Sequence, residues 1–292
     1  MAGRVREFWL ENSAGAKYQL NTQSVFFHQP TGLGYAVDLN TLRLGESNLI
    51  VSEDYNLGTV EGEVLFIGDR GEVYQKYFEF AQFLYYRPII LHYRTPNTFS
   101  SFRCQVRVVS VEKSEVNSTD GFLHIPISMY KQTMWYSDEE SVISVRAEYE
   151  ESKEYPLDRP YHYGALSTAG IDLVNGGVAN TPMIVQLEGE CTDVMWTLYD
   201  GQQNAYGATR ILGTYNFIRV DSSDLAESIA LETDGIVVPN AINYQDLTVG
   251  DPRHIYVTFL KLKPGRSKLV FNLTDEYDGT VTIRWRNAYV TV

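Results

Sequence analysis

Most of the chain alternates hydrophobic and polar residues with the two-residue period of β-strands, and one long stretch departs from that period. In residues 69–86, apolar side chains recur at steps of three and four residues, the spacing of an amphipathic helix. The predicted apolar face comprises Val73, Tyr74, Tyr77, Phe78, Ala81, Leu84 and Tyr85. Asp69 and Glu72 stand where a capping pair would begin the helix, and Pro88 ends it. We expect this helix to cover one face of a β-sheet.

The pattern before the helix predicts strands joined by polar turns. Strands are expected at residues 4–10, 17–20, 24–27 and 61–67, with a loop at 28–34. Residues 34–56 also alternate, with a turn near Gly45, and so predict a long hairpin. Its arms carry few apolar residues for their length, and two strands alone are marginally stable in water. We therefore expect this hairpin to need another surface to lie on, such as a second subunit.

The pattern after the helix completes one compact α+β unit and leads into a second domain. Strands are expected at residues 88–94, 102–116 and 121–129, and a further one at 141–149. The charged run at 150–159, which contains Pro156, predicts a linker. The expected domains are therefore residues 1–150, a β-sandwich with one helix and the long hairpin, and residues 156–292.

The second half reads as many short strands separated by turns that contain Gly, Pro, Asn or Asp. Strands are expected at residues 161–164, 171–174, 182–189, 193–198, 204–212, 217–221, 228–231, 236–238, 254–262, 268–272 and 280–289. In the last of these, Val281, Ile283 and Trp285 point to one face and Arg284 to the other. Short strands at regular spacing are typical of an antiparallel β-sandwich. The predicted fold class is therefore mainly β throughout.

Composition and charge narrow the range of functions. A length of 292 residues suits two domains, and 44% hydrophobic residues are enough to build both cores. A formal net charge of −13, with no basic run, argues against binding to the phosphate backbone of a nucleic acid. The first fifteen residues lack the apolar core of a secretion signal, and no run has the length of a membrane span. Folding in a cytoplasm, without membrane insertion, is the expectation.

No residue pattern predicts catalysis, a metal or a cofactor. The common motifs of nucleotide-binding proteins, serine hydrolases and zinc proteases do not occur in the sequence. His92 and His124 lie on strands predicted to be neighbours, but two histidines without a close carboxylate favour a structural role. Asp193 and Asp200 resemble a glycosidase pair, although their places at strand ends fit turn formation better. Cys104 and Cys191 are expected to be buried free thiols.

Sugar binding is the alternative function that the sequence leaves open. Sandwich domains often bind sugars through exposed aromatic side chains, and the second half is rich in tyrosine. Tyr206 and Tyr215 are the candidate contacts for a cell-wall glycan, whereas Trp196 is expected in the core. An enzyme acting on cell walls ranks third, because no catalytic pattern supports it.

Several stretches resemble a known family. SVFFHQPTGLGYAVDL, VEGEVLFIGDRGEVYQKYFEFAQFLYYRPIILHYR and IPISMYKQTMWY resemble the N-terminal half of distal tail proteins, which occur in siphophages of Gram-positive bacteria. NGGVANTPMIVQLEGECTDVMWTLYDG and VTFLKLKPGRSKLVFNL look like the galectin-like C-terminal domain of the same family. Together these stretches span nearly the whole chain.

The resemblance implies a structural role in the virion after assembly in the host cytoplasm. It implies a ring, expected to be hexameric, that joins the major tail protein to the tail-tip or baseplate hub and leaves a channel for DNA. In this family a hairpin "belt" lies on the neighbouring subunit, and here it matches residues 34–56. The expected intersubunit contacts are Leu39, Leu42, Leu44, Leu49 and Val51. The resemblance also makes the C-terminal domain a candidate anchor for receptor-binding proteins.

Overall fold

The computed structural model contains two compact units, each with its own hydrophobic core. It describes residues 6–95, 100–116, 121–147, 170–233, 235–238, 258–273 and 277–292. The first unit comprises Met1–Glu139 and Tyr289–Val292, and the second comprises Glu140–Ala288. The division falls earlier than residue 150, because β11 (Ser141–Ala147) pairs with a strand of the second unit. The expected linker at 150–159 lies outside the described residues.

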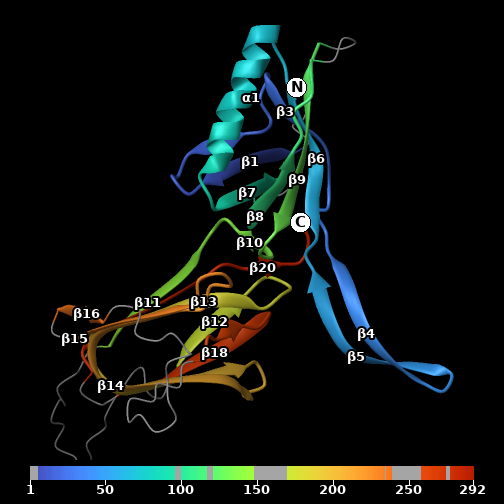
Figure 1. Cartoon of the computed structure of the whole chain (residues 1–292). Helices are drawn as coiled ribbons and strands as arrows, with labels where there is room; N and C mark the ends of the chain where they lie inside the picture. Colours follow the sequence, from blue (N-terminus) through green and yellow to red (C-terminus); the bar gives the residue numbers. More distant parts are fainter. Residues whose placement is uncertain are drawn as a thin grey trace, which may run out of the picture. The chain divides into compact units, whose positions relative to one another are not determined.

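The first unit is an antiparallel sheet with one helix (Figure 1). Its strands are β1 (Glu7–Asn12), β2 (Lys17–Gln19), β3 (Val25–Thr31), β6 (Thr59–Phe66), β7 (Ile89–Arg94), β8 (Ser101–Val111), β9 (Leu123–Lys131) and β10 (Trp135–Ser137). They follow the order β2-β1-β7-β8-β9-β6-β3, and β10 pairs with β8 and with β20 (Ala288–Tyr289). The predicted first hairpin, β1–β2, and the predicted pairing of β8 with β9 are confirmed.

The two ends of this sheet come together at Leu20. Its backbone N–H donates to the carbonyl of Phe8, and its carbonyl accepts from the N–H of Phe27. The rings of Phe8 and Phe27 meet edge to face, with centroids 5.3 Å apart. The sheet is therefore strongly curved and encloses its own core.

Strand β3 extends further than the sequence predicted. Residues 28–31 were expected in a loop, but the strand continues to Thr31 and pairs with β6 there. A register shift between His28 and Thr31, with Gln29 at a φ of 46°, accommodates Pro30 within the strand. Proline is tolerated because β3 is an edge strand of the sheet, where its missing N–H breaks no ladder.

Helix α1 (Arg70–Tyr85) matches the predicted helix, with Asp69 at its N-cap and its end three residues before Pro88. The Asp69 side chain makes no capping hydrogen bond, so the expected capping pair is not formed. The buried residues are Val73, Phe80 and Leu84. Phe80 packs against Phe66 of β6 and Tyr18 of β2, and Tyr77 packs against Phe66. Phe78 and Tyr85, predicted on the buried face, are exposed. Among the residues that the structure describes, no helix combines the length and the hydrophobicity needed to cross a membrane.

Strands β4 (Ala36–Leu44) and β5 (Ser47–Asn56) form the predicted long hairpin, which is a separate two-stranded sheet. Figure 1 shows it projecting from the ends of β3 and β6. Every residue of both strands is exposed.

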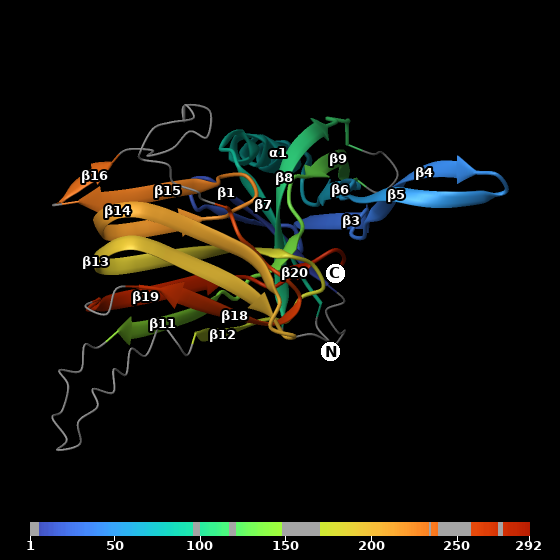
Figure 2. The same ribbon diagram turned by 90° about the horizontal axis from the view of Figure 1, so that it is seen from below.

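The second unit is the predicted antiparallel β-sandwich (Figure 2). Its remaining strands are β12 (Ile171–Asn175), β13 (Thr181–Asp200), β14 (Ala205–Asp221), β15 (Ser228–Thr233), β16 (Ile236–Val238), β17 (Lys261–Leu262), β18 (Gly265–Asn272) and β19 (Gly279–Trp285). The first half of β13 pairs with β19, and its second half pairs with β18. Val281, Ile283 and Trp285 face one way, as predicted, and are buried, whereas Arg284 is exposed.

Two pairs of expected strands are in fact two long bent strands. Residues 182–189 and 193–198 both belong to β13, and residues 204–212 and 217–221 both belong to β14. Register shifts between these strands occur on both sides of Cys191, where Gly189 and Asp193 have positive φ angles. Bulges of this kind bend a strand without ending it, so a local pattern that looks like a turn lies inside a continuous strand.

Candidate functional site: the exposed hairpin

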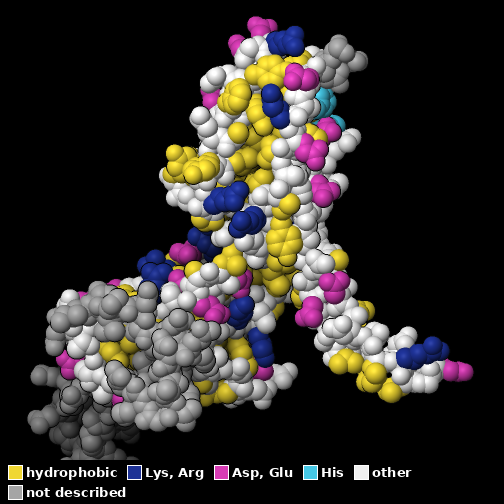
Figure 3. Space-filling model, in the orientation of Figure 1, with side chains coloured by type: hydrophobic (Ala, Val, Ile, Leu, Met, Phe, Trp, Pro, Cys, Tyr) yellow, Lys and Arg dark blue, Asp and Glu magenta, His cyan; other side chains and the backbone are white. Residues whose placement is uncertain are grey.

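The hairpin β4–β5 carries a concentration of exposed apolar side chains. Among the described residues, nine of nineteen exposed large hydrophobic residues lie between Tyr35 and Tyr55. The five predicted contact residues are all about half exposed, from 49% for Leu39 to 64% for Val51. Figure 3 shows hydrophobic side chains gathered along the projecting hairpin. Contiguous exposed apolar surface of this kind marks interaction sites.

The register of the hairpin divides the five predicted residues between its two faces. Leu42 lies opposite Leu49, and Leu44 is on the same face two residues further along β4. Leu39, opposite Glu53, points to the other face. Val51 is the extra residue at a register shift, where two residues of β4 face three of β5. The hairpin therefore presents apolar side chains on both sides.

The root of the hairpin is held by two buried side chains of the first unit. Lys131, at the end of β9, is only 2% exposed, and its Nζ donates to the carbonyl oxygens of Gly32 (2.8 Å) and Gly34. Trp135 Nε1 donates to the carbonyl oxygen of Leu33, 3.1 Å away. Three consecutive carbonyls are thus fixed directly before β4, and we call this arrangement the root clamp.

The sequence reasoning missed the root clamp, although one signal was present. Leu123, Ile125, Ile127 and Met129 alternate inward along β9, and Lys131 occupies the next inward position. A lysine in phase with a buried stripe needs acceptors inside the protein. Burial lowers the pKa of the Lys131 ammonium, and the backbone carbonyls supply those acceptors.

The two tyrosines proposed as glycan contacts lie in different surroundings. The Tyr206 hydroxyl is 2.9 Å from the Ser267 hydroxyl, and Lys263 Nζ lies 4.4 Å from the Tyr206 ring centre. The Tyr215 hydroxyl donates to the carbonyl of Leu212. Both rings pack partly against the core of the second unit. Sugar binding through these residues remains a prediction, and Trp196 is in the core as expected.

The aspartates that resembled a glycosidase pair serve turns and bulges. Asp200 accepts hydrogen bonds from the backbone N–H groups of Gln202 and Asn204 in the turn after β13. Asp193, at a φ of 52°, accepts from the N–H of Gly213 on the partner strand. These contacts agree with the structural interpretation made from the sequence.

The strands that carry His92 and His124 are not neighbours, so the expectation from the sequence is wrong and the two histidines do not meet. His92 is on β7 and His124 on β9, and β8 lies between them. His92 Nδ1 lies 2.9 Å from Asp138, and His124 lies 3.2 Å from Glu63. Burial opposes ionisation of Asp138, but hydrogen bonds from His92 and Ser101 hold the pKa of its carboxyl below the ordinary value. The described residues contain no group of three or more side chains suited to a metal.

Both cysteines are buried and free, as predicted. Burial raises the pKa of the Cys191 thiol to about 11 and that of Cys104 further still. The thiolate is the reactive form of cysteine. We therefore expect neither thiol of the native protein to react with a thiol reagent at pH 8. Two thiols should appear after unfolding in guanidinium. Rapid labelling of the native protein would contradict this burial.

Comparison with known proteins identifies the first unit by sequence and extends the likeness to both units by structure. The family "Distal tail protein, N-terminal domain" matches residues 7–132. No curated protein matches the chain. A chain of the phage P2 baseplate in its activated conformation with Ca is 15% identical, with a TM-score of 0.60, and the match covers 99% of this chain and 100% of that one.

The SPP1 Dit protein, described as a paradigm of the hub adsorption apparatus in phages that infect Gram-positive bacteria, is also 15% identical. The match covers 96% of this chain and 98% of that one, with a TM-score of 0.61. At this identity the likeness shows a shared fold, and the family match concerns the first unit. The resemblance drawn from the sequence is confirmed for the first unit, which contains the N-terminal domain of distal tail proteins at residues 7–132, and the whole chain shares its fold with the two phage proteins.

Proposed function

We propose that this protein forms a closed ring, expected to be a hexamer, between the tail tube and the tail-tip or baseplate hub. The observation that carries the proposal is the hairpin β4–β5, whose residues are all exposed and whose apolar side chains lie on both faces. A hairpin this thin gains a core only from another surface. A head-to-tail contact, hairpin of one copy on body of the next, closes into a ring when the rotation per copy divides the circle.

The remaining parts of the proposal rest on charge and on the family. The major tail protein and the tail hub are the expected neighbours, and the C-terminal unit is proposed as an anchor for receptor-binding proteins. A net charge of −13 suits a channel through which DNA must slide without sticking. The protein works in the virion, by geometry rather than by turnover, after assembly in the host cytoplasm.

The test is the double substitution Leu42→Ser and Leu49→Ser. These side chains face each other near the tip of the hairpin and are about half exposed, so far-ultraviolet circular dichroism should show an unchanged fold. Ring formation should be lost, because the buried apolar contact that stabilises it is removed. Light scattering after size-exclusion chromatography measures the mass of the assembly, and negative-stain imaging shows whether rings form.

The matched control is Val178→Ser, which changes a side chain of the second unit that is 63% exposed. It should assemble like the unaltered chain. Rings of normal size from the Leu42→Ser, Leu49→Ser variant would refute the proposal, as would an unaltered chain that stays monomeric at high concentration.

A further inference from the structure

A second surface of the first unit combines exposed aromatic rings with arginine. Phe78 and Tyr85 lie seven residues apart on the exposed side of α1, and Tyr86 follows directly. The exposed fractions are 55% for Phe78, 83% for Tyr85 and 55% for Tyr86. The rings of Tyr85 and Tyr86 meet edge to face, 5.9 Å between centroids. Tyrosine and arginine are enriched at the centres of protein interfaces.

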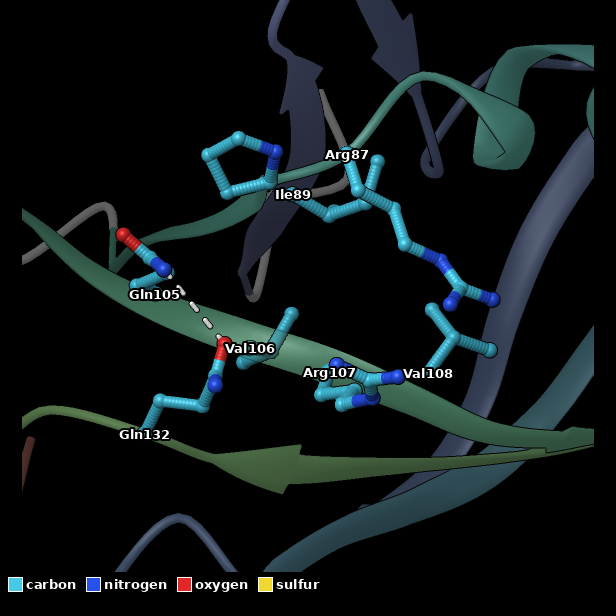
Figure 4. A pocket seen from close by; sticks show the side chains of 8 residues that line it. Arg87, Ile89, Gln105, Val106, Arg107, Val108 and Gln132 are labelled. Carbon is cyan, nitrogen blue, oxygen red and sulfur yellow. Dashed lines mark hydrogen bonds between the residues drawn. The ribbon is translucent and has the colours of Figure 1, made fainter.

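The arginines border a groove directly after these tyrosines. The groove, about 280 Å³ in volume, is lined by Arg87, Pro88, Ile89, Gln105, Val106, Arg107, Val108 and Gln132. Figure 4 shows the side chain of Arg87, which lies two residues before β7, extending toward β8, which carries Arg107. Both arginines are exposed, and neither forms an ion pair with any described residue of the chain. In a chain with 37 acidic residues, two neighbouring arginines without a carboxylate partner in the described part of the chain can bind a carboxylate of another molecule.

One face of the hairpin has the complementary chemistry. Asp38 and Asp54 lie directly opposite each other, on the same face as the Leu42–Leu49 pair. Like charges directly opposite on a sheet are destabilising, and Asn56 donates a hydrogen bond to only one of them, Asp38. The whole hairpin contains four carboxylates and one arginine, Arg43, so it carries a net negative charge.

The spacing along the two surfaces also corresponds. Four residues separate Asp38 from Leu42, about 13 Å along a strand. Phe78 and Tyr85 are about 10 Å apart along the helix, and Arg87 lies two residues further on. β4 spans about 30 Å, enough to lie across a neighbouring domain.

We infer that this surface, made of Phe78, Tyr85, Tyr86, Arg87 and Arg107, is the seat for the hairpin of a second copy of the chain. The leucine pair of the incoming hairpin packs on the aromatic rings, and Asp38 and Asp54 pair with the two arginines. The inference rests on the proposed ring and adds the receiving side of its contact.

Charge reversal tests the seat. Variant A carries Asp38→Lys and Asp54→Lys, and variant B carries Arg87→Glu and Arg107→Glu. Each variant alone places like charges together at every contact, so self-association should weaken at least tenfold. In a one-to-one mixture, the hairpin lysines of variant A meet the glutamates of variant B, and the hairpin aspartates of variant B meet the arginines of variant A. The mixture should therefore restore rings in which the two variants alternate, with an even number of copies. Circular dichroism first establishes that both variants are folded.

Cysteine cross-linking tests the contact directly, because the native cysteines are buried. Mixing a Leu49→Cys variant with a Tyr85→Cys variant under mild oxidation should give a covalent dimer of the two. The matched control is Ile50→Cys, at the same level of the hairpin but on the opposite face, which should cross-link poorly.

The outcomes separate this inference from the proposed ring. If A and B each form normal rings, or if Ile50→Cys cross-links as well as Leu49→Cys, the seat is wrong. The ring itself still stands in that case, provided that Leu42→Ser with Leu49→Ser abolishes it. If the unaltered chain neither assembles nor cross-links, both proposals fall together.

Discussion

Replacing Gly32 with alanine is expected to lower the free energy of unfolding of the first unit by about 3 kcal/mol or more. Gly32 has a φ of +75°, and a Cβ atom there would lie 1.8 Å from the carbonyl oxygen of Thr59 and 2.8 Å from its carbonyl carbon. Both atoms belong to the backbone at the start of β6, so no side-chain rotation can relieve the clash. The start of β6 or the end of β3 must move. Chemical denaturation followed by circular dichroism measures the loss.

Gly58→Ala is the matched control for this prediction. Gly58 follows β5 at the other side of the hairpin root and has nearly the same φ, +67°, but a Cβ atom there meets nothing within 4 Å. Its substitution should cost only the conformational strain, about 1 kcal/mol. Equal losses for the two variants would show that the close approach to Thr59 has no effect on stability.

Replacing Lys131 with methionine is expected to lower the free energy of unfolding by about 2–4 kcal/mol, because the carbonyls of Gly32 and Gly34 lose their donor. Methionine nearly matches the volume of lysine, so the effect is not that of a cavity. Hydrogen exchange of residues 33–36 should accelerate, since the root clamp no longer fixes the backbone before β4. Ring formation should weaken although the hairpin residues are unchanged.

Lys17→Met provides the control for loss of a lysine. Lys17 is exposed and lies 3.7 Å from Glu11, a surface pair whose removal should change stability by less than about 0.5 kcal/mol. Unchanged exchange at residues 33–36 in the Lys131→Met variant would contradict the clamp. Trp135→Phe, which removes the N–H that bonds Leu33, should give a smaller acceleration in the same segment.

Much of the fold follows from the period of the sequence. The single helix, the long hairpin, the β8–β9 pair and the alternation of the final strand are all local patterns, and local patterns decide local structure. What local patterns cannot reveal is pairing between distant strands. The order of the sheet places β8 between His92 and His124, and nothing in either neighbourhood indicates it.

Helix α1 shows a second limit of prediction from the sequence. Val73, Tyr77, Phe80 and Leu84 form one stripe, and Tyr74, Phe78, Ala81 and Tyr85 form the stripe beside it. Both stripes are apolar and contain aromatic residues, so helical spacing cannot say which one is buried. Tertiary packing against Tyr18 and Phe66 decides in favour of the first. The exposure of the hairpin leucines could be expected from the sequence, because the two arms carry few apolar residues for their length. The root clamp could not be expected, because it joins residues about a hundred positions apart.

The pairing of β10 with β20 has a consequence for how the second unit can be exchanged. The chain leaves the first unit after Glu139 and re-enters it at Tyr289, and these two points are adjacent because β10 and β20 are hydrogen-bonded neighbours. Domains whose two termini lie close together are readily exchanged. Genetic recombination at residues 140 and 288 would transplant the whole sandwich as a cassette, without any change to the hairpin or its root.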